Sequence, residues 1–411
     1  KLINGKGEKM EQNFIDEVEK YITQIAFSGA TQFLEQYKDK TEGDQIIGHF
    51  GLGFYSAFMV ADEVHIDTLS YKEGATPVHW ECDGGSEYDM QDGDKATVGT
   101  EITLFLNEDN LEFANEYRAR EVIEKYCSFM PVEIYFVNEE EEAKKAEEAA
   151  KKDAEEKVID VDVKDADAKE NNADTEDGDS EVTLEEEEEE EDDAPKPINQ
   201  IHPLWTKHPN DCTDEEYKEF YRDVFHDYKE PLFWIHLNMD YPFNLKGILY
   251  FPKINTKYDT IEGTIKLYNN QVFIADNIKE VIPEYLLLLK GCIDCPDLPL
   301  NVSRSALQND GFVKKISNYI TKKVAEKLSG MCKTDRENYE KYWDDISPFI
   351  KFGCIRDQKF NDKMKDYIIF KNMEGKYVTL PDYLEAGKEK YENNVFYITD
   401  EVAQSQYINM F

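Results

Sequence analysis

Three glycines within residues 47–56 carry the first chemical signal in this sequence. Gly48, Gly51 and Gly53 stand in the run Ile-Gly-His-Phe-Gly-Leu-Gly-Phe-Tyr-Ser, and apolar residues follow from Phe54 onward. Glycine accepts positive φ and lets a ligand approach the main chain. A helix that starts after such a loop offers unpaired N–H groups to a phosphate. The pattern predicts a loop that feeds a helix, although most isolated G-x-x-G-x-G runs are ordinary turns.

Two familiar phosphate-binding motifs are excluded by the residues around this loop. A P-loop ends in Gly-Lys-Ser or Gly-Lys-Thr, whereas this loop ends in Gly53-Phe54-Tyr55. A dinucleotide-binding loop follows a clear strand, whereas residues 38–45 before this loop are polar.

The charge of the chain is strongly negative and unevenly placed. The 411 residues carry a net charge of −41, and residues 139–195 contain 28 Asp and Glu against 7 Lys. This balance argues against a nucleic-acid binder. A stretch of this composition cannot bury enough apolar surface to offset the cost of ordering it. We interpret residues 138–199 as an acidic, disordered linker between two folded regions, with transient helix over 143–157 as the less favoured alternative.

Targeting and redox signals point to the cytoplasm. The chain has no apolar run of about 18 residues and no charged-then-apolar leader, so no membrane span is predicted. Its seven cysteines are scattered, as is typical of a reducing compartment. Cys292 and Cys295 form the single C-x-x-C, but no second pair or nearby histidine completes a zinc site. We interpret both as incidental half-buried thiols and assign no metal ligands.

Hydrophobic periodicity predicts a mixture of helices and strands in both folded regions. Helices are expected over 16–27, 111–130, 213–225, 283–290, 310–324, 336–351 and 362–370, and another from 381. Strands are expected over 64–68, 78–81, 101–106, 132–137, 232–238, 245–251, 264–267, 272–275, 377–380 and 395–398. Thr213 and Glu216 form a capping box that marks one helix start. The fold class is therefore α+β.

Several segments together resemble the heat-shock protein 90 chaperones, most nearly those of the bacterial HtpG type. They are residues 25–29 (Ile-Ala-Phe-Ser-Gly), 47–56, 99–104 (Gly-Thr-Glu-Ile-Thr-Leu), 233–234 (Phe-Trp), 297–304 (Asp-Leu-Pro-Leu-Asn-Val-Ser-Arg) and 397–400 (Tyr-Ile-Thr-Asp). These segments occur in the family's order and at its spacing over nearly the whole chain. The acidic stretch also falls where the family places its charged linker.

The resemblance implies four parts. Residues 1–137 would be part of an N-terminal ATP-binding domain of the Bergerat type, a two-layer α/β sandwich. Residues 138–199 would be the linker, and residues 200–330 the large αβα part of a middle domain. Residues 331–411 would be a helical connector and the start of a smaller αβ part.

The resemblance also implies which residues hold ATP. The glycine loop would pack on the phosphates, the aromatic residue after it would contact the nucleotide, and a threonine would join the adenine-binding network. These residues are Gly48, Gly51, Gly53, Phe54 and Thr100.

Two further groups are implied to act on bound ATP. Ser28 and Gly29 would belong to a mobile lid. Arg304 matches the family's middle-domain arginine that reaches the nucleotide, with Asn301 before it and Gln308 one helical turn after it. Lid closure would bring the two domains together, and hydrolysis would release them.

The sequence departs from the family at both ends. The family's general-base Glu, its Mg²⁺-binding Asn and its Asp-x-Gly-x-Gly-Met segment are not matched in residues 1–14, and its dimerisation domain is not matched before Phe411. We therefore expect the intact protein to be a homodimeric chaperone that uses ATP and Mg²⁺. We expect this chain, as a fragment truncated at both ends, to be an incomplete ATPase.

Trp205, Phe233 and Trp234 are candidate contacts for unfolded or partly folded client proteins, because exposed aromatic side chains suit loose recognition. Ordinary core packing is the favoured alternative for these three residues.

Two other functions stay open. Another ATPase with the same nucleotide fold, such as a type II topoisomerase, a mismatch-repair protein or a sensor kinase, would need a basic DNA-binding region or a phosphoacceptor histidine helix. A partial product that only binds proteins needs neither feature.

The arginine assignment gives a test in the intact protein. We expect Arg304→Ala to cut ATP hydrolysis sharply while largely sparing ATP affinity, because a guanidinium placed on the γ-phosphate neutralises charge during phosphoryl transfer. Steady-state turnover and calorimetric titration measure the two effects separately. Equal turnover by variant and parent would refute the assignment.

Overall fold

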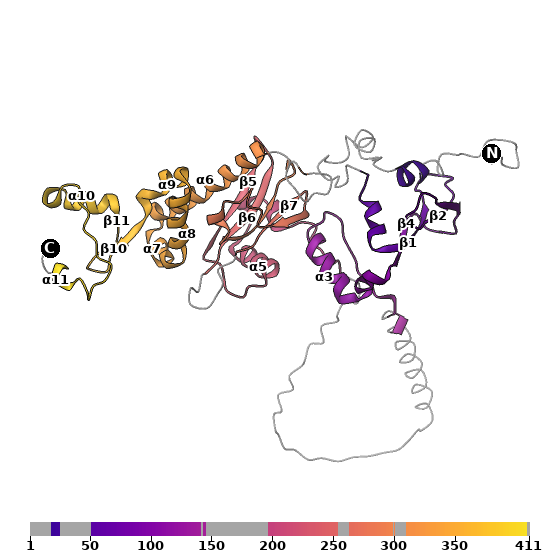
Figure 1. Ribbon diagram of the computed structural model, residues 1–411, viewed down its shortest axis with the longest axis horizontal. Helices are drawn as coiled ribbons and strands as arrows, with labels where there is room; N and C mark the ends of the chain where they lie inside the picture. Colours follow the sequence, from indigo (N-terminus) through magenta and orange to yellow (C-terminus); the bar gives the residue numbers. More distant parts are fainter. Residues whose placement is uncertain are drawn as a thin grey trace, which may run out of the picture. The chain divides into compact units, whose positions relative to one another are not determined.

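The structure is a computed structural model that describes residues 18–24, 51–140, 143–144, 196–253, 263–298, 300 and 310–408. Figure 1 shows its helices and strands. Among the described residues, those from 55 to 201 form one compact unit, called the first unit below. The described residues from 202 onward, together with those up to 54, form the second unit. Within residues 18–24, η1 (Glu19–Thr23) is a single turn of π-helix inside the predicted helix over 16–27.

The first unit is built on an antiparallel four-stranded sheet in the order β3-β2-β1-β4. Its strands are β1 (Ala61–Leu69), β2 (Val78–Cys82), β3 (Asp89–Asp92) and β4 (Gly99–Leu106). Successive strand residues face opposite sides of a sheet. Val64 and Ile66 of β1 and Trp80 of β2 are accordingly buried on one face. The strands predicted over 64–68, 78–81 and 101–106 are confirmed as β1, β2 and β4.

Helical elements flank the sheet along the chain, with η3 before β1 and the others after β4. η3 (Phe54–Met59) and η4 (Glu108–Ala114) are 3₁₀ helices, and α3 (Glu116–Cys127) is an α-helix. The predicted helix over 111–130 is therefore two elements. Asn115 separates them, because its backbone is extended and its side-chain oxygen caps α3 by accepting from the Arg118 N–H at 3.3 Å.

The predicted strand over 132–137 is wrong, because a side chain takes the hydrogen bonds that a neighbouring strand would make. The Asn199 carbonyl oxygen accepts from the Ile134 N–H at 2.8 Å. The Asn199 amide donates to the carbonyl oxygens of Met130 at 2.8 Å and Val132 at 2.6 Å. The Ile198 N–H also donates to the Ile134 carbonyl at 2.8 Å. Residues 198–200 therefore fold with the first unit, and the boundary between the units lies at residues 201–202.

The second unit contains a five-stranded sheet in the order β5-β6-β9-β7-β8, in which only the β7–β9 pair is parallel. Its strands are β5 (Phe233–Met239), β6 (Leu245–Phe251), β7 (Ile265–Asn269), β8 (Val272–Asp276) and β9 (Lys290–Asp294). The predicted helix over 283–290 is wrong, since only η7 (Glu284–Leu286) is helical there. Residues 291–294 of β9 are buried, so this strand lacks the alternation that marks a half-buried strand.

Helices cover both faces of this sheet, as Figure 1 shows. α5 (Asp214–Phe225) begins at the predicted capping box, in which the Thr213 hydroxyl accepts from the Glu216 N–H and the Glu216 carboxylate accepts from the Thr213 N–H. α5 packs aromatic residues against one face. α6 (Asp310–Thr334) buries Ile316, Ile320 and Val324 against the other face.

The chain continues through short helices into a small hairpin. The elements are α7 (Arg336–Lys341), α8 (Trp343–Arg356), α9 (Gln358–Met364), η8 (Lys365–Tyr367), β10 (Ile369–Lys371), β11 (Tyr377–Thr379), α10 (Leu380–Tyr391) and α11 (Ser405–Ile408). The predicted strand over 395–398 is wrong. The Gln404 side-chain oxygen accepts from the Thr399 and Asp400 N–H groups at 2.7 and 3.1 Å. These bonds hold residues 399–404, directly after the predicted strand, in a turn.

Asn199 provides a stability test. Asn199→Ala leaves the Ile134 N–H and the Met130 and Val132 carbonyls without their partner. A hydrogen bond contributes about 0.5–1.5 kcal/mol net, so with three of them lost we expect residues 128–138 to open with a loss of roughly 2–4 kcal/mol. Hydrogen exchange followed by mass spectrometry measures this loss in peptides from that segment.

Gln200→Ala is the matched control, because the Gln200 side chain is exposed and its backbone N–H keeps its bond to the Ser128 carbonyl at 2.8 Å. Equal exchange rates in the two variants would show that Asn199 does not hold the segment.

Candidate functional site

The glycine loop enters the described residues at Gly51. Gly51 has φ of +62°, a left-handed conformation that favours glycine. A side-chain carbon added at Gly53 would meet no atom within 4 Å, which leaves open space beside the backbone. The helix that follows, η3, is a short 3₁₀ helix. Gly48, the first glycine of the loop, lies outside the described residues.

Thr100 lies at the start of β4, opposite Thr68 of β1 in the sheet register. The two hydroxyl oxygens are 2.8 Å apart, and the Thr68 hydroxyl also reaches the Gly99 carbonyl at 3.3 Å. The contact with Thr68 orients the Thr100 hydroxyl. The Thr100 side chain is exposed to solvent. Sequence reasoning missed Thr68, because its contact with Thr100 depends on the pairing of β1 with β4.

Phe54 is the first residue of η3 and is half-buried. The remaining residues implied to act on ATP lie outside the described residues. They are Ser28, Gly29, Asn301, Arg304 and Gln308. Their roles stay predictions.

Trp205 is 1% exposed and lies in an aromatic layer beneath α5. Its ring centroid is 5.7 Å from that of Phe220 and 5.2 Å from that of Tyr268. Its carbonyl oxygen lies 3.4 Å from His236 Nε2. Direct contact between this side chain and a client is therefore excluded in this structure, and Trp205 belongs to the core.

Phe233 and Trp234 point to opposite faces of β5. Phe233 is 8% exposed and stacks on Phe251 with ring centroids 4.2 Å apart, so it also belongs to the core. Trp234 is half-buried and stacks on Tyr217 at 4.8 Å. Of the three aromatic candidates, Trp234 alone keeps substantial solvent contact. Periodicity could not separate the three, because both faces of this sheet are covered.

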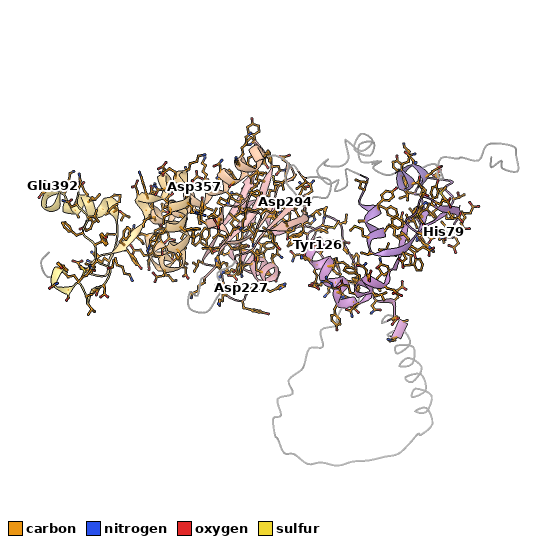
Figure 2. All side chains as sticks on the ribbon, viewed as in Figure 1. His79, Tyr126, Asp227, Asp294, Asp357 and Glu392 are labelled. Carbon is orange, nitrogen blue, oxygen red and sulfur yellow. The ribbon has the colours of Figure 1, made fainter. Side chains whose placement is uncertain are left out.

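Asp294, labelled in Figure 2, is a buried carboxylate at the end of β9. It is 5% exposed and accepts from the Gln271 N–H at 2.9 Å. Burial raises its pKa to about 6, although the hydrogen bond from the Gln271 N–H acts in the opposite direction. This group therefore titrates in a mildly acidic range where exposed aspartates are already charged.

The two cysteines of the C-x-x-C motif are inert in this fold. Cys292 and Cys295 are both 0% exposed, more deeply buried than predicted. Burial raises the pKa of each thiol to about 12, so neither forms a reactive thiolate near neutral pH. All seven cysteines of the chain are free.

Within the described residues, no helix is both long and apolar enough to cross a membrane.

Comparison with known sequences identifies the family. A sequence model described as "Hsp90 protein" matches residues 112–411. The chain belongs to the Hsp90 protein family. The match covers most of the chain, including every described element of the second unit from η5 (Leu204–Thr206) onward.

Curated relatives in this family are named chaperone proteins. The protein from Bacteroides fragilis strain YCH46, "Chaperone protein htpG", is 43% identical over 386 residues, which cover 93% of this chain and 50% of the relative. "Chaperone protein HtpG" of Porphyromonas gingivalis strain ATCC 33277 is 42% identical, with coverage of 96% and 52%. The same-named protein of Geobacter sulfurreducens is 32% identical, with coverage of 96% and 56%. The chain spans about half the length of these relatives. The resemblance seen in the motifs is thus confirmed.

The raised pKa of Asp294 predicts how stability depends on pH. The folded state holds this proton more tightly than the unfolded state, whose pKa is near 3.8. The resulting stabilisation is present in full below pH 3.8 and is lost as pH rises through 6. Asp294→Asn removes this dependence. Between pH 4 and pH 7 the free energy of unfolding of the variant, relative to that of the parent, should therefore rise by up to about 3 kcal/mol.

Urea unfolding followed by tryptophan fluorescence measures this gain, since three of the four tryptophans lie in the second unit. Asp240→Asn, at an exposed position, is the control that should show no gain. A constant difference between Asp294→Asn and the parent across this range would contradict the assignment.

Proposed function

We propose that this chain is part of an ATP-dependent molecular chaperone. The observation that carries the proposal is membership of the Hsp90 family together with relatives that are named chaperone proteins. The intact protein would bind unfolded or partly folded clients and hydrolyse ATP to open and close around them. It would act as a homodimer in the cytoplasm, without nucleic acid or membrane. The free state of all seven cysteines supports a reducing location.

One wall of the proposed ATP site, on a domain of the Bergerat type, would be formed by residues of the glycine loop and by the start of β4. Gly51 and Gly53 would let the phosphates approach the main chain, and Phe54 would contact the nucleotide. Positive φ at Gly51 and open space at Gly53 support this role. Thr100 would offer its hydroxyl to the adenine network, and its exposure at the start of β4 supports that role.

Catalysis would depend on residues outside the described part of the chain. Arg304 would neutralise charge on the γ-phosphate, with Asn301 and Gln308 beside it, while Ser28 and Gly29 would close over the nucleotide. Gly48 would complete the glycine loop. Mg²⁺ would spread the charge of the phosphates, and we assign it no ligand among the described residues.

Client binding is proposed on the second unit. Trp234 is half-buried and stays available on the face of β5 that carries α5, so it replaces Trp205 and Phe233 as the aromatic candidate. Two rivals are weaker. A DNA-directed ATPase with the same nucleotide fold does not fit the family match. A non-enzymatic protein-binding product shares client binding but not ATP hydrolysis.

An aggregation assay tests the client-binding part of the proposal on this chain itself. A model client is heated until it aggregates, and light scattering is followed without ATP. We expect an equimolar amount of the folded chain to suppress scattering by at least about half, because clients would bind the second unit before nucleotide acts.

An acidic protein that is not a chaperone, at equal mass concentration, controls for crowding and charge. No suppression at tenfold molar excess, with the chain shown to be folded by circular dichroism, would contradict client binding.

A further inference from the structure

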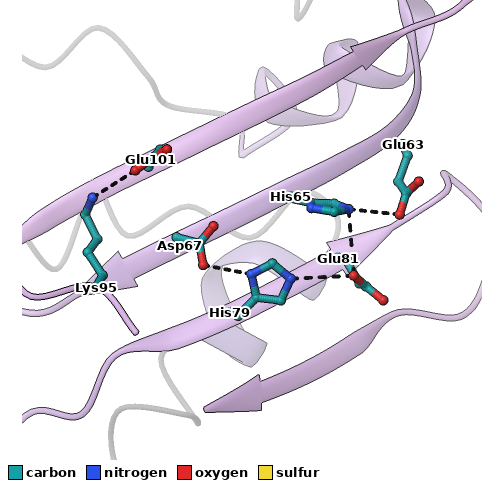
Figure 3. Close-up of polar contacts among 7 residues, drawn as sticks. All are labelled: Glu63, His65, Asp67, His79, Glu81, Lys95 and Glu101. Atoms are coloured by element: carbon teal, nitrogen blue, oxygen red, sulfur yellow. Dashed lines mark hydrogen bonds and ion pairs between the residues drawn. The ribbon is translucent and has the colours of Figure 1, made fainter. Parts of the chain in front are cut away.

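The polar face of the sheet in the first unit gathers two histidines and several carboxylates. On β1, Val64 and Ile66 point into the core, so His65 and Asp67 lie on the other face. The register places His65 opposite Glu81 of β2 and Asp67 opposite His79. Two cross-strand pairs of imidazole and carboxylate therefore lie side by side, as Figure 3 shows.

The ligand atoms of three of these side chains converge. His65 Nε2 lies 3.7 Å from Glu81 Oε2, and His79 Nε2 lies 3.5 Å from the same oxygen. One ligand atom from each of the three residues lies within 4.8 Å of the others. Glu63 brings a fourth donor, because its Oε1 lies 2.9 Å from His65 Nε2.

Asp67 orients one of the imidazoles. His79 Nδ1 lies 2.7 Å from Asp67 Oδ1, so Nδ1 carries the proton that this hydrogen bond needs. In the neutral imidazole the lone pair is then on Nε2, which faces Glu81. A carboxylate that accepts from the second nitrogen of a ligating histidine is the usual support of a metal-binding imidazole.

We propose that His65, His79 and Glu81 form a binding site for zinc or a similar divalent transition-metal ion, with Asp67 as the positioning residue for His79. Tetrahedral zinc with ligands at about 2.0–2.1 Å requires ligand atoms about 3.3–3.4 Å apart. The distances from the Glu81 oxygen to His65 Nε2 and His79 Nε2, 3.7 and 3.5 Å, are within a few tenths of an ångström of that spacing.

The chemistry of the donors selects the ion. Two imidazoles and one carboxylate suit zinc, whereas magnesium and calcium prefer oxygen ligands alone. The side chains of His65 and His79 are 23% and 19% exposed, so an ion can enter from solvent. Both histidines stand on paired strands, and little backbone ordering is needed on binding. Lys95, the nearby lysine in Figure 3, is paired with Glu101 at 3.2 Å.

The site is separate from the proposed nucleotide contacts within the first unit. Thr68, which holds Thr100, lies on the face of β1 that carries Val64 and Ile66, opposite to His65 and Asp67. The inference therefore does not depend on the proposed ATP site. A metal ion here would join β1 to β2.

The alternative is that protonated imidazoles simply form ion pairs with these carboxylates. A zinc titration of the 411-residue chain distinguishes the two, with calorimetry for affinity and nitrogen-15 NMR of the imidazoles for the binding atoms. We expect Nε2 of His65 and of His79 to shift on zinc addition. We expect His79→Gln and Glu81→Gln each to weaken the site at least tenfold, and Asp67→Asn to weaken it about tenfold through the lost orientation of His79.

His202→Asn, an exposed histidine outside the cluster, is the matched control and should leave zinc affinity unchanged. The chain's thiols and acidic stretch are the same in all variants, so zinc held by them cancels in the comparison. Circular dichroism confirms that each variant folds. Identical zinc titrations for the parent, His79→Gln and Glu81→Gln, or imidazole signals of His65 and His79 that do not move, would overturn the proposal.

Discussion

Coverage of both faces of the five-stranded sheet is the constraint on which the chemistry of the second unit depends. α5 covers one face with an aromatic layer, and α6 covers the other with aliphatic side chains. Trp205 is therefore an interior residue, and the same burial raises the pKa of Asp294 to about 6. Gly247 of β6 has no room for a side chain, because the Cys292 carbonyl of β9 lies against it. Residues that look reactive in the sequence are structural here.

The sheet of the first unit differs because its strands β1 and β2 bury only one face, and its chemistry follows from the partly exposed other face. β1 and β2 bury one face through Val64, Ile66 and Trp80, which leaves the alternate residues partly open to solvent. Polar side chains held on paired strands keep fixed spacing at little entropic cost, which is what a ligand site needs. His65 and His79 therefore lie close together on a partly exposed face of the sheet.

Local patterns predicted the elements whose partners lie nearby in sequence. The alternation of Val64 with Ile66 marked β1, and Thr213 with Glu216 marked the start of α5. Patterns failed where the partner is remote. The strand expected at 132–137 loses its hydrogen bonds to Asn199, 65 residues beyond Ile134. Likewise, neither strand alone shows that His65 and Glu81 are neighbours, because the β1–β2 register decides it. The catalytic roles came only from resemblance to a family.

The hydrogen bonds made around Asn199 stabilise the contact between residues 128–134 and 198–200 by little more than the entropy cost of closing the loop between them. Five hydrogen bonds join residues 128–134 to residues 198–200, and Asn199 makes three of them. At about 1 kcal/mol net each they contribute about 5 kcal/mol. If the roughly 65 residues between these segments are unstructured, closing the loop costs about 4 kcal/mol by the length term alone. Because the two terms are of similar size, the contacts of a single buried amide decide whether residues 198–200 stay with the first unit.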